Sequence, residues 1–181
     1  MMKLQQVEKI IKEETVYQGK KINVKMAQTI CPSGNPALRE KVERRNGTAI
    51  LALTEDNEVI LEHNWRYAFK EDILCLPAGK TDSGESYLAA AKRELEEEAG
   101  IQAENWVNLG IIRPAPAYSD EEVGLFLATG LKEGKKSWDE DEYLLVEKVP
   151  FAEFAELIRD NRINDARTLL AYYRYLEYKM L

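Results

Sequence analysis

The sequence predicts an α/β or α+β fold in which helices pack against a mixed sheet. Apolar runs of strand length recur along the chain, amphipathic segments of helical length accompany them, and no long linker or internal repeat interrupts the pattern. The chain has 181 residues, of which 45% are hydrophobic. This length and composition suit one folded domain with a small appended arm.

Residues 1–46 predict a small antiparallel strand unit, and residues 47–181 predict the main domain. Ile22, Val24 and Met26 stand at every second position, which is typical of a half-buried strand. A Pro-Ser-Gly-Asn-Pro run follows and predicts a turn. Further strands are expected at 49–53, 59–61, 73–76, 107–112, 123–128 and 144–149, the first two as a hairpin.

Three helices are expected, at 86–99, 151–160 and 166–179. Gly100 is a natural end for the first, and Asp165 is a candidate N-cap for the last. The tyrosines of the last helix are expected to pack against the sheet or another subunit rather than to form an aromatic binding stripe.

The charge balance argues against a protein that binds nucleic acid or an anionic membrane through a broad basic surface. The chain has 32 acidic against 25 basic residues, a net charge of −7. No stretch approaches the roughly 20 apolar residues that span a bilayer. The amino terminus lacks an apolar signal core, so we expect a cytoplasmic protein with no nucleic-acid or membrane partner.

The cysteine and histidine content limits the kind of metal site. Cys31 and Cys75 make neither a disulfide framework nor a zinc-like cluster, and His63 is the only histidine. Carboxylates must therefore hold any metal ion, which favours magnesium, manganese or calcium.

The helix at 86–99 carries suitable carboxylates. At about 100° per residue, Glu94, Glu97 and Glu98 fall within one arc of about 100°. Like charges at neighbouring helix positions repel one another, and a cation is the direct way to relieve that repulsion. A neighbouring apolar stripe is expected to contact the core: Leu88, Ala91, Leu95 and Ala99.

The stretch from 79 to 101 resembles the signature of the Nudix hydrolase family. Nine specified positions across 23 residues fit without a gap: Gly79, Glu85, Arg93, Glu94, Leu95, Glu97, Glu98, Gly100 and Ile101. The resemblance implies a mixed sheet between helices, with the signature forming a loop, a helix and a loop. It also implies Mg²⁺-dependent hydrolysis of a nucleoside diphosphate linked to another group, with Mn²⁺ as a substitute metal.

The same resemblance implies roles for individual residues. Glu94 and Glu98 would be metal ligands, together with the backbone carbonyl of Ala78, and Glu97 would assist catalysis. Arg93 and Glu85 would orient the acids and brace the loop. These roles belong to the family pattern and are carried onto the matching positions of this chain.

Two further features resemble the ADP-ribose pyrophosphatases and related nucleoside diphosphate sugar hydrolases of that family. Pro77-Ala78-Gly79 leads into the signature, and Pro116 lies sixteen residues beyond Gly100, before an acidic loop. Glu121 matches the general base of that loop, with Glu122 as an adjacent alternative. The run Ala-Pro-Ala replaces the usual Ser-Pro-Gly, which weakens assignment to ADP-ribose alone more than assignment to sugar nucleotides.

The resemblance also suggests how the substrate is bound. Arg66 and Arg45 are candidate ligands of the diphosphate or sugar, and the strand unit at 1–46 would contribute to a homodimer and its nucleotide pocket. We therefore expect a nucleoside diphosphate sugar hydrolase that yields a nucleoside monophosphate and a sugar phosphate. The alternatives are hydrolysis of a dinucleoside polyphosphate, coenzyme A or an oxidised nucleoside triphosphate, or a non-catalytic nucleotide-sugar-binding module.

Overall fold

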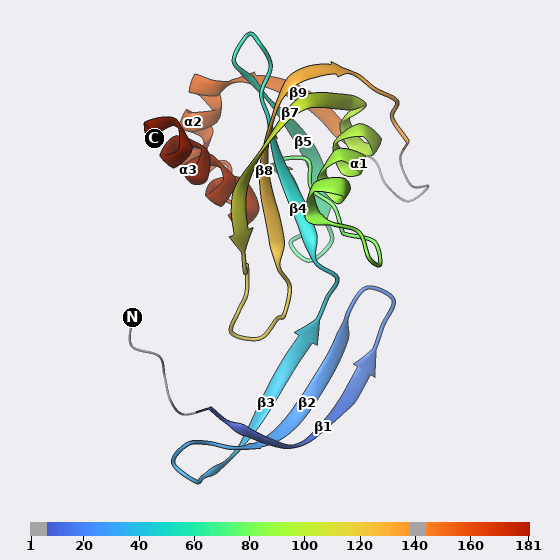
Figure 1. The fold of residues 1–181 in the computed structure, drawn as a ribbon, viewed down its shortest axis with the longest axis vertical. Coiled ribbons are helices and arrows are strands. Elements are labelled where there is room, and N and C mark those ends of the chain that lie inside the picture. Colours follow the sequence, from blue (N-terminus) through green and yellow to red (C-terminus); the bar gives the residue numbers. More distant parts are fainter. Residues whose placement is uncertain (1–6, 138–143) are drawn as a thin grey trace. The chain divides into compact units, whose positions relative to one another are not determined.

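The computed structural model describes residues 7–137 and 144–181, and within them the chain forms nine strands and three helices (Figure 1). The chain divides into two compact units. The first contains residues up to Arg45 together with Ala115–Glu121, and the second contains Asn46–Pro114 and Glu122–Leu181.

The first unit is built on a three-stranded antiparallel sheet, as expected for this part of the chain. Its strands are β1 (Lys9–Gln18), β2 (Asn23–Ile30) and β3 (Pro36–Glu43), paired in that order. The turn between β2 and β3 contains Gly34, whose φ of 88° lies in the left-handed region that glycine adopts without strain.

The second unit contains two three-stranded sheets. Its strands are β4 (Gly47–Ala52), β5 (Glu58–Arg66), β6 (Glu71–Cys75), β7 (Ile101–Ile112), β8 (Val123–Glu133) and β9 (Leu145–Pro150). The first sheet is mixed, with order β4-β8-β7: β4 runs parallel to β8, and β7 runs antiparallel to it. The second sheet is antiparallel, with order β6-β5-β9.

The prediction that β4 and β5 form a hairpin is wrong, because the two strands pair only next to the turn between them. Leu53 and Val59 form a single antiparallel bridge, after which the two strands enter different sheets. Every residue of β4 is buried, which requires that both faces of the strand are covered. The strand meets this requirement in the mixed sheet beside β8, where α1 and α3 both contact it, and not in the sheet of β5.

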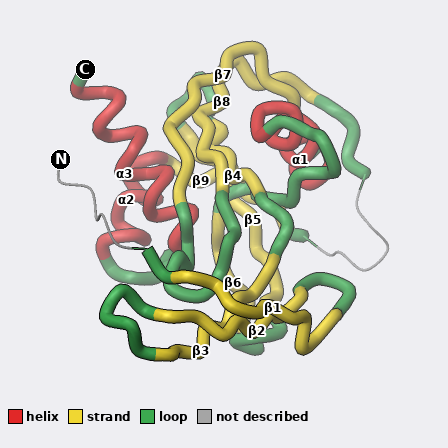
Figure 2. The backbone as a smooth tube through the Cα atoms, turned by 60° about the horizontal axis from the view of Figure 1, so that its bottom comes forward, coloured by secondary structure: helices red, strands yellow, loops and turns green. Residues whose placement is uncertain are grey.

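The helices match the predicted segments: α1 spans Tyr87–Ala99, α2 spans Phe151–Arg159 and α3 spans Ala166–Met180. α1 covers one face of the mixed sheet, and α2 and α3 lie on the opposite side (Figures 1 and 2). The predicted mixed sheet between helices is therefore confirmed. No helix in the described part of the chain combines the length and the apolar character that a membrane span requires.

Two cores hold these layers together. On the α1 side, Ala91 and Leu95 pack against Ile50 and Phe126 of the sheet. On the other side, α2 and α3 bring aromatic side chains onto the sheet, including Phe154, which is fully buried. Leu88 does not join the α1 core, because it lies in the first turn of the helix and 37% of its surface is exposed.

Candidate active site

The segment Pro77–Lys80 lies along the free edge of β4. The Ile50 amide donates to the Pro77 carbonyl and the Thr48 amide donates to the Gly79 carbonyl, both at 2.9 Å. Peptide groups alternate in direction along an extended segment. The N–H and carbonyl of Ala78 are therefore directed away from β4.

The side of this segment that faces away from β4 meets two glutamates of α1. The Ala78 amide donates to Glu98 Oε2 at 2.9 Å, and Glu98 is only 5% exposed. A Cβ atom at Gly79 would lie 1.8 Å from Cδ of Glu94, so only glycine leaves room for that carboxylate. The structure thus brings together Glu94, Glu98 and the segment at Ala78 and Gly79.

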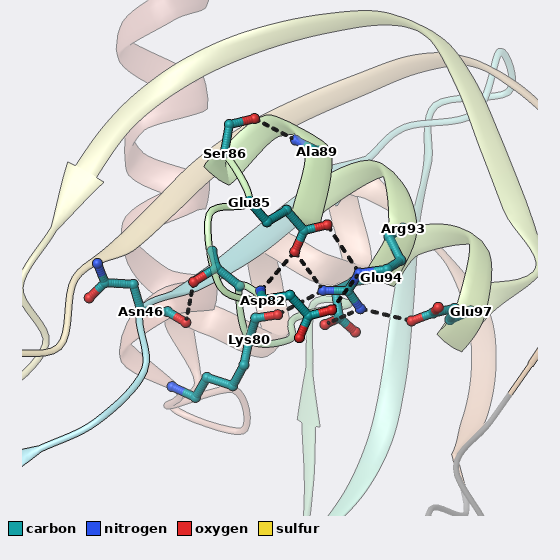
Figure 3. A network of polar contacts seen from close by, with 10 residues as sticks. Asn46, Lys80, Asp82, Glu85, Ser86, Ala89, Arg93, Glu94 and Glu97 are labelled. Atoms are coloured by element: carbon teal, nitrogen blue, oxygen red, sulfur yellow. Dashed lines mark hydrogen bonds and ion pairs between the residues drawn. The ribbon is translucent and has the colours of Figure 1, made fainter.

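Arg93 organises the remaining acids (Figure 3). Its guanidinium donates to Glu85 at 3.1 and 3.0 Å, to Glu94 at 2.9 Å and to Glu97 at 2.8 Å. It also donates to the carbonyl of Lys80 at 2.8 Å, which ties the loop to the helix. A planar guanidinium with five donors suits this task, whereas a lysine ammonium could not reach all of these acceptors.

The charges in this network support one another. The hydrogen bond from Arg93, together with that from the Asp82 amide, holds the pKa of Glu85 below its ordinary value. The same contact with Glu85, and then those with Glu94 and Glu97, raise the pKa of Arg93. Both groups are therefore charged at neutral pH, and the loop is braced by an ion pair.

The ends of α1 follow from local sequence. The Ser86 hydroxyl accepts a hydrogen bond from the Ala89 amide at 3.2 Å, and Gly100 adopts φ 68° and caps the carboxyl end. Glu97 and Glu98 lie in the last turn, where the helix dipole disfavours negative charge. Carboxylates at this end of a helix therefore lower the stability of the helix, and a bound cation would offset that loss.

Among the described residues, no group of three or more His, Cys, Asp or Glu side chains is arranged as a metal cluster. Glu94 and Glu97 instead accept hydrogen bonds from Arg93, and Glu98 accepts one from the Ala78 amide. The donors at this point are nevertheless all oxygen atoms, two carboxylates and a carbonyl, and they suit a hard divalent cation.

The other predicted site residues are distributed over both units. Arg66 ends β5, and its Nη2 lies 3.9 Å from the thiol of Cys75, whose pKa burial raises to about 11. Arg45 and Glu121 belong to the first unit. Within that unit the side chain of Glu121 is 12% exposed, lies 3.5 Å from the guanidinium of Arg44, and follows the Ser119 hydroxyl, which accepts the Glu121 amide at 3.2 Å.

Three residues that support the site carry no signal in the sequence. Thr168 of α3 accepts the Leu76 amide at 3.1 Å, Tyr87 of α1 donates to Glu122 at 3.3 Å, and Asn46 accepts the Glu122 amide at 3.0 Å. Each joins segments that are far apart in the chain, and no periodicity or spacing reports such a contact.

A family model independently identifies the domain. The NUDIX domain model matches residues 43–172. The chain therefore belongs to the Nudix family, and the resemblance found in its signature is confirmed.

Individual proteins of similar sequence or structure indicate which class of Nudix protein this chain resembles. The chain is 32% identical to the methanol dehydrogenase activator of Bacillus methanolicus, over 94% of this chain and 92% of that protein. It is 33% identical to the ADP-ribose pyrophosphatase of Bacillus subtilis, over 95% and 94%. A crystal structure of an ADP compounds hydrolase superposes with a TM-score of 0.86 at 27% identity, over 98% of this chain and 96% of that chain.

These findings confirm the predicted enzyme class, a Nudix pyrophosphohydrolase. Hydrolases of this family are in general dependent on a divalent metal, in agreement with the oxygen donors gathered beside Ala78.

Proposed function

We propose that this protein hydrolyses the pyrophosphate bond of ADP-ribose and related nucleoside diphosphate sugars, with Mg²⁺ as its metal. The products would be a nucleoside monophosphate and a sugar phosphate. Two relatives that align over nearly the whole chain are named for ADP-ribose and ADP compounds, which supports this substrate class. The observation that carries the proposal is that Glu98 meets the amide of Ala78 while Glu94 lies against Gly79.

The metal ligands in this proposal are Glu94, Glu98 and the carbonyl of Ala78. Gly79 supports the assignment, because the missing side chain is what allows Glu94 to lie against the loop. Mg²⁺ accepts carboxylate and carbonyl oxygens alongside substrate phosphates, and Mn²⁺ accepts the same donors. When bound, such a metal neutralises phosphate charge and lowers the pKa of a coordinated water.

The chain's own residues divide the remaining work. Glu121 accepts the proton of the attacking water as general base, and Glu97 assists in keeping the acidic site in place. Arg66 and Arg45 bind the anionic diphosphate or sugar, where a guanidinium can donate two hydrogen bonds to one phosphate. Arg93 and Glu85 hold the loop and helix in register.

We also propose that residues 1–46 form a dimerisation unit that contributes to the nucleotide pocket of a homodimer. Apolar side chains on this sheet are exposed by more than half: Ile10, Ile11, Val16, Tyr17 and Leu38. A groove of about 370 Å³ lies among them, lined in part by Ile11, Ile30 and Leu38. Exposed apolar area of this kind favours association. Light scattering of the purified chain, with Leu38→Glu as the disrupting variant, measures the oligomeric state.

A substrate panel tests the function. The purified protein is incubated with ADP-ribose, other nucleoside diphosphate sugars, a diadenosine polyphosphate, coenzyme A and an oxidised nucleoside triphosphate, with and without Mg²⁺. Released phosphomonoester is measured by coupled phosphatase. We expect Mg²⁺-dependent turnover that is highest for the sugar nucleotides. Turnover that is higher for another class would reassign the substrate, and calorimetric binding without product would identify a binding module.

A further inference from the structure

Glu122, next to the proposed general base, is held by several partners through both its side chain and its backbone. Its Oε1 accepts a hydrogen bond from Arg113 Nε at 2.9 Å and forms an ion pair with Nη2 of the same guanidinium at 2.8 Å. Its Oε2 accepts the hydroxyl of Tyr87 at 3.3 Å. Its amide donates to Asn46 Oδ1 at 3.0 Å, and its carbonyl accepts the Gly47 amide at 2.9 Å. All of these partners belong to the second unit.

Tyr87 connects Glu122 to the signature helix. It is the first residue of α1, and its side chain passes directly over Gly124 of β8, where a Cβ atom would lie 2.8 Å from Cβ of Tyr87. Burial, and then the charge of Glu122, raise the pKa of the Tyr87 hydroxyl, so it remains a donor at neutral pH. The end of the acidic loop and the start of α1 are therefore joined through one hydrogen bond.

Asn46 connects Glu122 to the signature loop. The Asn46 carbonyl accepts the amide and the hydroxyl of Thr81, at 3.0 and 3.3 Å, and its side-chain oxygen accepts the Glu122 amide. That amide belongs to the peptide group between Glu121 and Glu122, so holding it restricts the backbone from which Glu121 extends. Arg113 directly follows β7, so its hydrogen bond with Glu122 joins the two ends of the connection between β7 and β8.

We propose that Glu122 is a positioning residue that anchors the carboxyl end of the acidic loop to α1 through Tyr87 and to the signature loop through Asn46. It does not act as the general base. Its carboxylate already accepts hydrogen bonds from Arg113 and Tyr87 and is ion-paired with the Arg113 guanidinium, which would have to leave before Oε1 could accept a water proton. This inference rests on the proposed function, because it concerns the loop that carries the general base Glu121.

The test compares Glu122→Gln, Glu122→Ala and Glu121→Gln in the full-length protein with ADP-ribose and Mg²⁺. Glutamine keeps a carbonyl oxygen for Arg113 and an amide beside Tyr87, but it cannot accept a proton as a base. We expect Glu122→Gln to retain kcat within about threefold and Glu122→Ala to lose about tenfold, whereas Glu121→Gln loses at least about a hundredfold. Rescue by glutamine separates positioning from proton transfer.

The pH dependence adds a second readout. Glu122→Gln should keep the acid limb of the kcat profile, since that limb reports the general base. Tyr87→Phe removes only a hydroxyl and should lower kcat by about two- to threefold, with no further loss when combined with Glu122→Ala. This variant keeps the proposal testable if Glu122→Ala does not fold. The proposal would be overturned if Glu122→Gln lost as much kcat as Glu121→Gln, or if the acid limb of its kcat profile disappeared.

Failure of the proposed function would look different. In that case the wild-type protein would hydrolyse no sugar nucleotide, and the anchor would be judged by hydrogen exchange of the peptide that spans residues 113–122. Faster exchange in Glu122→Ala, restored to the wild-type rate in Glu122→Gln, supports the anchor without any turnover. Equal exchange in all three proteins contradicts it.

Discussion

Helices α1 and α3 lie on opposite faces of the same mixed sheet, and both hold the short segment that leads into the signature. From α3, the Thr168 hydroxyl accepts the Leu76 amide at 3.1 Å. From α1, the Glu98 carboxylate accepts the Ala78 amide at 2.9 Å. The two amides that they hold are two residues apart in the chain, and each donates one hydrogen bond, to a hydroxyl in one case and to a carboxyl group in the other.

The surroundings of the two anchors differ in the same way. Thr168 is fully buried and neutral, and it donates its own proton to the N-cap Asp165, so its polar groups are satisfied within the fold. Glu98 is almost as buried but has an ionisable carboxyl group, which lies among other acids at the end of a helix whose dipole opposes negative charge. The α3 anchor therefore stabilises the fold, whereas the α1 anchor places a carboxyl group at the proposed metal site.

The largest expected effect is on turnover, at the charged anchor. Glu98→Gln should lower kcat at least about a hundredfold, equivalent to about 2.7 kcal/mol of barrier, while the far-UV circular dichroism spectrum is unchanged. Glutamine can still accept the Ala78 amide, so the loss would reflect the missing charge. Glu96→Gln is the matched control, since Glu96 lies on the same helix and bonds to Gln102. Normal turnover in Glu98→Gln would remove Glu98 from the site.

The next effect concerns the close approach of loop and helix. Gly79→Ala would place Cβ within 2.1 Å of both oxygens of Glu94, so that carboxylate must move. A displacement of about 1 Å at a catalytic group costs up to about a hundredfold in rate, and we expect a loss of tenfold or more in kcat. Gly110→Ala is the control, because nothing lies near its Cβ and its φ of 108° affects stability alone. Equal kcat in the two variants would contradict this reading.

The neutral anchor should affect stability more than chemistry. Thr168→Val keeps the shape but leaves the buried Leu76 amide without its acceptor, which costs about 1–3 kcal/mol of unfolding free energy. Thr168→Ser keeps the hydroxyl and should recover most of that loss. Urea denaturation measures both, and kcat at low temperature is expected to change little. A loss of turnover in Thr168→Val as large as in Glu98→Gln would erase the difference between the two helices.

The smallest effect is the acid sensitivity of the α3 anchor. Burial alone would raise the pKa of Asp165, but Arg167 and Thr168 outweigh it and hold that pKa below 3.8. The unfolded chain therefore binds more protons, so this stabilisation is present above pH 3.8 and is lost as the pH falls through the folded pKa.

Asp165→Asn tests that assignment. Asparagine is an equally good N-cap, so the loss of unfolding free energy at pH 7 should be about 1 kcal/mol or less. The difference between wild type and variant should shrink towards zero as urea titrations are repeated at lower pH. A difference that stays constant down to pH 3 would show that the charge of Asp165 contributes nothing.

Local sequence predicted most of the elements. Gly100 ends α1 and Asp165 caps α3, as expected, because a cap depends on residues within one turn of it. Helical spacing also predicted that Glu94, Glu97 and Glu98 would share one arc of α1. In the structure, Glu94 and Glu97 both meet Arg93, and Glu94 and Glu98 both meet the segment at Ala78 and Gly79. By contrast, the β4–β5 hairpin was predicted wrongly, because strand pairing depends on distant segments, and Leu88 was wrongly predicted to be buried, because it lies in the first turn of α1.

By itself, then, the sequence determined the family, the helix that carries the acids and the residue types available to hold a metal. Only the tertiary structure decided that a neutral hydroxyl and a charged carboxylate hold neighbouring amides from opposite faces of one sheet, and that Glu122 is bound by Arg113, Tyr87 and Asn46. The physical reason is the distance along the chain over which each kind of contact acts. Spacing within a helix follows from 3.6 residues per turn, whereas contacts between distant segments follow from sheet order, which no local pattern encodes.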